Sequence, residues 1–100
     1  MTRRERLREL LVRALDCRVD ALLWNGELAL AQDQARAAVD LEPFRESGYR
    51  RLMQVLARRG DRGEAVRVYQ QCRQRLADDL GVTPSDETES LLRTLLGTTA

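Results

Sequence analysis

Few residues of this 100-residue chain have side chains that commonly do chemistry. The chain has two cysteines, Cys17 and Cys72, which stand far apart without CxxC spacing, and it contains no histidine. So sparse a set of ligands argues against a metal site. The sequence has no P-loop, nucleophile elbow or glycine-rich phosphate cradle. It therefore predicts no catalytic, cofactor or metal site, and a protein that acts by binding rather than as an enzyme.

The thiols and the paired carboxylates have structural interpretations. Cys72 falls on a packing position of its expected helix, which predicts a buried and unreactive thiol. Cys17 is expected to be partly exposed, and a redox-sensing role for it stays an alternative. The carboxylates of Asp86 and Glu87 lie where a helix is expected to begin, so they favour that helix through its dipole.

The charges are balanced. All 17 basic residues are arginine, and 16 acidic residues leave a net charge of +1, which is not typical of a domain that neutralises many phosphates. The arginines of residues 3–8 are diluted by nearby glutamates, and Glu9 and Arg13 are spaced as an ordinary surface ion pair. We therefore expect no direct sequence-specific DNA binding by this chain alone. Arginine without lysine or isoleucine is typical of a high-GC bacterial genome.

The beginning of the chain does not look like a targeting segment. Met1 and Thr2 lead into a charged amphipathic run rather than an apolar signal-peptide core. No apolar stretch approaches the length of a membrane span. These features predict a soluble, cytoplasmic protein with free thiols and no membrane contact.

Every segment between the breaks of the chain reads with a helical period. The breaks are Asn25-Gly26, Glu42-Pro43, Arg59-Gly60-Asp61 and Gly81-Val82-Thr83-Pro84. They delimit five expected helices, over 4–24, 27–41, 44–59, 62–80 and 85–96. In the first helix, Leu7, Leu11, Leu15, Val19 and Leu22 are expected to face the core. Asp61 is expected to cap the fourth helix, and Thr83 with Pro84 the fifth.

The chain also repeats itself with a period of 34 residues. The period aligns Gly26 with Gly60, Ala31 with Ala65, Leu22 with Leu56, Val19 with Met53, Leu15 with Tyr49, Ala35 with Tyr69 and Ala38 with Cys72. A 34-residue helix–turn–helix period is typical of tetratricopeptide repeats. We therefore predict an all-α fold of two tetratricopeptide-like antiparallel helix pairs and a C-terminal capping helix, in a right-handed superhelical stack.

Two pairs and one further helix are few for such a stack. Repeat proteins usually need about three units to bury a continuous core. We expect the missing burial to come from another domain or from a second copy of the chain, and a homodimer is the favoured arrangement.

The stretch from Leu41 to Leu96 resembles the bacterial transcriptional activator domain, the helical half of actinobacterial antibiotic-regulatory proteins. The resemblance rests on Leu41-Glu42-Pro43-Phe44-Arg45-Glu46, on Tyr49-Arg50-Arg51-Leu52-Met53, on Gly60-Asp61-Arg62-Gly63-Glu64-Ala65, on Tyr69-Gln70-Gln71-Cys72-Arg73 and on Leu76-Ala77-Asp78-Asp79-Leu80-Gly81-Val82-Thr83-Pro84-Ser85. The first helix pair matches more loosely.

The resemblance implies a function in transcription. In that family the helical domain typically follows a winged-helix DNA-binding domain, and it contributes self-association, contacts to that domain and regulation of the activator. The chain has no winged-helix segment, so residues 1–100 are expected to be a single domain and a fragment of a longer regulator. The alternative is a stand-alone tetratricopeptide adaptor that binds a peptide and has no role in transcription.

The concave face of the stack is the candidate partner site, because such faces commonly bind partners. By register it holds Arg13, Asp16, Asp20 and Trp24 in the first unit, and Arg50, Gln54 and Arg58 in the second. A plain solvated helix face is the alternative. For Trp24, packing under the Asn25-Gly26 turn is favoured over a place in the groove.

Overall fold

A computed structural model describes residues 1–97, so the last three residues of the expected 1–100 domain lie outside the described part. The expected all-α class is confirmed, and residues 1–97 contain no strand. The elements are α1 (Arg3–Trp24), α2 (Leu28–Leu41), α3 (Glu46–Arg58), α4 (Arg62–Arg75), the π-helical segment η1 (Leu76–Leu80) and α5 (Asp86–Leu95).

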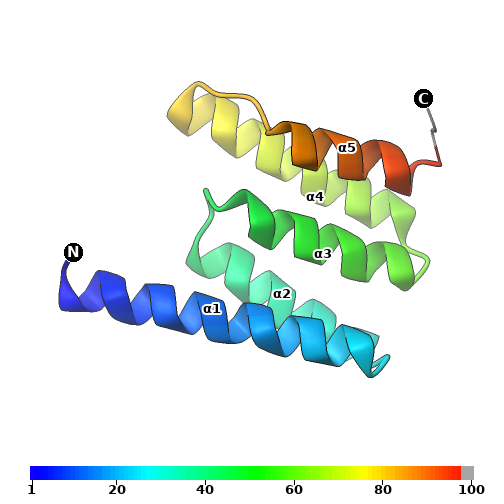
Figure 1. Cartoon of the computed structure of the whole chain (residues 1–100). Helices are drawn as coiled ribbons and strands as arrows, with labels where there is room; N and C mark the ends of the chain where they lie inside the picture. Colours follow the sequence, from blue (N-terminus) through cyan, green and yellow to red (C-terminus); the bar gives the residue numbers. More distant parts are fainter. Residues whose placement is uncertain (98–100) are drawn as a thin grey trace.

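The helices form two layers (Figure 1). α1, α3 and α5 lie side by side in the front layer and run in the same direction, while α2 and α4 lie behind them and run the opposite way. α2 packs against both α1 and α3, and α4 packs against α3 and α5. The smallest dimension of the molecule is 18 Å, which fits two layers of helices about 10 Å thick. α1 and α5 therefore occupy opposite edges of the stack.

The two inter-helix turns that follow α1 and α3 are alike. Gly26 and Gly60 adopt left-handed φ angles of 76° and 80°, which glycine tolerates without strain. In each turn the residue after the glycine donates its backbone N–H to a leucine carbonyl five residues back, from Glu27 to Leu22 and from Asp61 to Leu56, both at 2.9 Å. The 34-residue period of the sequence is thus visible in the backbone hydrogen bonds.

The core lies between the layers. Ala31 and Ala65, at 0% and 1% exposure, present small side chains where the paired helices meet, and this lets the backbones approach closely. Larger side chains fill the centre, and the fully buried ones include Tyr49, Leu52 and Met53 of α3. α3 is the central helix because it contacts α1, α2, α4 and α5.

The expected core face of α1 is wrong in its N-terminal half. Leu7 and Leu11 are 58% and 51% exposed, whereas Val12 and Asp16 are buried. Val19 is buried as expected, so the predicted and observed faces meet only in the C-terminal half of the helix. α1 has apolar residues on two sides, and a helical period alone does not tell which side meets α2 and α3.

The start of α5 also differs from expectation. Ser85 is the N-cap, because its side chain accepts a hydrogen bond from the backbone of Thr88, and buried Pro84 precedes the cap. Thr83 with Pro84 is therefore not the cap.

The fourth expected helix does continue to Leu80, but its last turn widens to a π-helix that ends at Gly81 in the left-handed region. The Asp61 cap of α4 is confirmed by its hydrogen bond from Glu64 N–H, at 3.3 Å. Within residues 1–97, no helix is both long enough and apolar enough to cross a membrane.

Candidate protein-interaction groove

Three adjoining hollows lie along the front layer, between α1, α3 and α5. Their volumes are about 280, 500 and 450 Å³, and Gln54 lines all three. Arg50 and Leu91 are each shared by two of them, so the hollows form one continuous surface, which we call the central groove. The exposed side chain of Gln54 therefore stands at the middle of the groove.

Arg50, which lines two of the three hollows, is held by partners from α3 and α5. Its guanidinium donates to Thr88 Oγ1 at 2.9 Å and lies 3.2 Å from the Glu87 carboxylate and 3.8 Å from that of Glu46. Its charge is thus largely balanced within the domain. The end of the groove near Arg50 therefore offers paired polar groups rather than a free cationic clamp.

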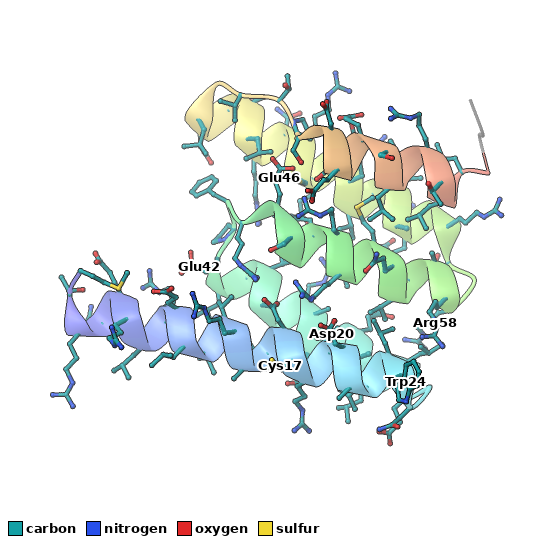
Figure 2. The ribbon with its side chains drawn as sticks, viewed as in Figure 1. Cys17, Asp20, Trp24, Glu42, Glu46 and Arg58 are labelled. Atoms are coloured by element: carbon teal, nitrogen blue, oxygen red, sulfur yellow. The ribbon has the colours of Figure 1, made fainter. Side chains whose placement is uncertain are left out.

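Arg51 lines the α1 side of the groove. Its Nε donates to Asp20 Oδ1 at 3.2 Å, and its Nη1 lies 3.5 Å from Asp16 Oδ2. Figure 2 shows Asp20 on the side of α1 that faces α3. Asp16 itself is buried and also pairs with Arg45, the residue that precedes α3. Asp16 therefore joins α1 to α3 and is not among the residues that line the groove.

The other end of the groove is apolar. Leu23 of α1, Ala57 of α3 and Leu91 and Leu95 of α5 line it. Arg58 closes this end by donating a hydrogen bond from Nη1 to the Leu23 carbonyl at 2.8 Å. An apolar end beside a polar, charge-paired end suits a protein segment with both kinds of side chain.

Glu46 holds α5 in place, and so fixes the far wall of the groove. Its carboxylate accepts from Ser85 N at 3.0 Å and from Thr88 Oγ1 at 2.6 Å. Burial favours the neutral acid, but these hydrogen bonds and the charge of Arg50 outweigh it, so the pKa of Glu46 lies below its ordinary value. The carboxylate is therefore ionised at neutral pH, which is the form that accepts both bonds.

A second contact ties α5 to α4. Tyr69 Oη donates to Glu89 Oε1 at 2.6 Å. Burial, together with the hydrogen bond and charge of Glu89, raises the pKa of Tyr69 to about 12, so the phenol stays protonated and remains a donor. α5 is thus held by polar contacts on two helices as well as by its leucines.

The remaining predicted site residues lie elsewhere. Arg13 is exposed and pairs with Glu9 at 3.0 Å, as its spacing indicates, and it does not line the groove. Trp24 is 89% exposed at the end of α1 (Figure 2), so the favoured packing under the Asn25-Gly26 turn is wrong. The turn closes through its own backbone hydrogen bonds, without the indole. Of the seven predicted residues, the structure brings together Asp20, Arg50, Gln54 and Arg58.

The sequence interpretation missed one entire wall of the groove. That wall is α5, which contributes Glu87, Ser90, Leu91, Thr94 and Leu95. The interpretation also missed Arg51 of α3. The leucine spacing of α5 was the available signal, because a helix that buries only part of its leucines leaves the rest to line a surface.

The two thiols differ as expected. Cys72 is buried, and burial, reinforced by the negative charge of Glu46, raises the pKa of its thiol to about 11. Cys17 is exposed on α1. Residues 1–97 contain no group of three or more histidine, cysteine or acidic side chains placed to hold a metal ion.

An all-α stack of short antiparallel helices with a groove along one layer defines the class of the domain. The chain belongs to the bacterial transcriptional activator domain family, whose sequence profile matches residues 1–96. It is 37% identical over 95 residues to the regulatory protein AfsR of Streptomyces coelicolor and 36% identical over 93 residues to that of Streptomyces griseus. These matches cover 95% and 93% of the chain but only 10% of each regulator. No solved structure matches the chain significantly.

Proposed function

We propose that this chain is the protein–protein interaction and oligomerisation module of a bacterial transcriptional regulator. Residues 1–100 act as a single domain within a longer cytoplasmic protein, and they contact a winged-helix DNA-binding domain or a second copy of the chain. Membership of the transcriptional activator domain family supports this function, as does the match to one tenth of two much longer regulatory proteins. The module needs no catalytic step or cofactor.

We further propose that the helices stack in the tetratricopeptide manner, as two pairs and a capping helix in a right-handed superhelix. The equivalent glycine turns at Gly26 and Gly60 and the equivalent buried alanines Ala31 and Ala65 support this arrangement. In such a stack α1, α3 and α5 line the inner face, which is where the central groove lies.

The central groove is the proposed site for the partner, and its continuity across three helices is the observation that carries the proposal. Gln54 makes the sharpest test because it is exposed and lines all three hollows. Charge reversal at Arg50 is less informative, since it would also break the contacts that hold α5 to α3. A bulky substitution at Gln54 fills the groove and leaves those contacts intact.

The experiment measures binding of the purified chain to the winged-helix domain encoded in the same reading frame, by titration calorimetry. Gln54→Trp should weaken binding by about tenfold or more, because a blocked groove loses at least about 1.4 kcal/mol of contact energy. Gln71→Trp on α4 is the matched control, since Gln71 is also an exposed glutamine but does not line the groove. Equal affinities of the two variants would remove the groove from the proposal. If no winged-helix domain is encoded there or none binds, the peptide-binding adaptor takes precedence.

A further inference from the structure

α1 carries a second apolar face that the fold does not use. It consists of Leu7, Leu10, Ala14, Cys17, Ala21 and Trp24, and we call it the outer stripe. The spacing alternates between three and four residues, so the side chains form one row along the helix. All six residues are exposed, with Leu7 at 58%, Leu10 at 51% and Trp24 at 89%.

The outer stripe points away from the core. Val12 and Val19, which face α2 and α3, are buried, and at 100° per residue they lie roughly opposite the stripe on the helix. α1 also forms one edge of the stack, so nothing in residues 1–97 covers this side (Figure 1). The stripe presents an apolar surface on the order of several hundred Å², and monomeric proteins seldom leave such a patch open without a use.

We propose that the outer stripe binds the same stripe of a second copy, with the two α1 helices antiparallel across a two-fold axis. The stripe is self-complementary in this orientation. With the axis midway between Ala14 and Cys17, Ala14 meets Cys17 of the second copy, Leu10 meets its Ala21, and Leu7 meets its Trp24. The small side chains come together at the centre, where helices must approach most closely, and the large ones enclose the two ends.

The charges beside the stripe favour the antiparallel direction. Arg3, Arg4 and Arg6 have no ion-pair partner among residues 1–97, and neither does Glu27 in the turn after α1. In the antiparallel arrangement this basic start of α1 lies at the level of the end of α1 in the second copy, where Glu27 stands in the following turn, and this holds at both ends of the interface. A parallel pair would instead place the two arginine runs against each other, which is repulsive.

This inference rests on the oligomerisation part of the proposed function and assigns it to a surface that is separate from the central groove. Two such stripes bury on the order of 1,000 Å² together, which is the lower range of specific interfaces. The dimer is therefore expected to dissociate on dilution. Sedimentation equilibrium over a wide range of concentration is the suitable measurement.

The wild-type chain should approach twice its mass of 11.4 kDa as the concentration rises. Leu10→Glu should raise the dissociation constant roughly 100-fold, because it places a charge in both copies of the interface. Leu80→Glu is the matched control, since Leu80 is 53% exposed, close to the 51% of Leu10, but lies at the end of η1. Both side chains are on the surface, so circular dichroism should show unchanged helix content.

Cross-linking tests the direction of the helices. In a Cys17→Ser background, a mixture of Leu10→Cys and Ala21→Cys chains should form a disulfide-linked dimer, because Leu10 meets Ala21 of the second copy in the antiparallel register. Either variant alone should not, since its two new thiols would stand about 17 Å apart along the helices. Both replaced residues are exposed.

A monomer at every concentration would overturn the inference, as would a dimer that Leu10→Glu leaves intact. Efficient cross-linking of Leu10→Cys with itself would overturn the antiparallel register. Failure of the groove is a separate result, because Gln54→Trp should weaken binding of the winged-helix domain without changing the dimer mass. The two surfaces can therefore fail independently.

Discussion

Asp16 is a buried carboxylate whose charge is balanced by two arginines. Arg45, the N-cap residue of α3, and Arg51, in the second turn of α3, both contact it. Burying an ionised carboxylate is costly unless its oxygens are paired, so these contacts allow a charged residue to sit on the core face of α1. The partners lie about 30 residues away in sequence, and no local pattern links them to Asp16. The sequence therefore places Asp16 in the groove, while the structure uses it to join two helices.

The two cysteines should differ sharply in reactivity. Burial raises the pKa of Cys72 from an ordinary value of 9.0 to about 11, which lowers its thiolate fraction at neutral pH roughly 100-fold. In dilute solution, where the chain is monomeric, a disulfide reagent should therefore modify one thiol per native chain quickly, and a second only after denaturation. Cys17→Ser should abolish the fast reaction, whereas Cys72→Ser should leave its rate unchanged. Two fast thiols in the folded chain would contradict the buried position of Cys72.

At the level of the helices, the turn after α3 depends on glycine for its backbone geometry. Gly60 has a φ of 80°, and a methyl group added there would meet nothing within 4 Å, so backbone strain is the only cost of an alanine. Gly60→Ala should lower the free energy of unfolding by about 1–2 kcal/mol, measured by urea denaturation. Gly63 is the matched control, because it is also uncrowded but lies inside α4. Gly63→Ala should be neutral or stabilising by up to about 1 kcal/mol, and equal losses at both positions would contradict this account.

Helix positions were largely predictable, because turn residues such as Gly26 and Gly60 and the cap at Asp61 act locally. The buried faces of the helices were less predictable. The period of α1 fits both its core face and its outer stripe, and the choice between them depends on which side α2 and α3 cover. For the same reason the groove was half predicted. Gln54 and Asp20 followed from the register of α1 and α3, but the wall from α5 depends on the docking of Ser85 and Thr88 to Glu46, which is a tertiary contact.

On the scale of the whole molecule, the exposed surfaces of the front layer divide into two kinds. The central groove offers paired charges beside an apolar end, and its arginines Arg50, Arg51 and Arg58 already have partners within the domain. The outer stripe on the edge helix is almost wholly apolar. A groove of the first kind suits a partner that binds and releases, while an uncovered apolar edge suits a copy of the same chain. One helix, α1, contributes to both surfaces, so a second copy on the stripe would lie beside the groove without filling it.

The overall charge predicts how the isolated chain behaves toward DNA. The net charge is +1, and Arg45, Arg50 and Arg51 are engaged by carboxylates, which leaves the arginines of residues 3–8 as the main basic run. So short a basic run should give only non-specific binding, with a dissociation constant of about 100 µM or weaker at physiological salt. Selection from a pool of random duplexes should therefore yield no consensus sequence. Glu9→Arg, which extends the basic run, should strengthen binding to all duplexes equally and steepen its salt dependence. A consensus recovered with the wild-type chain would show base-specific contacts, and DNA recognition would then have to be assigned to this domain itself.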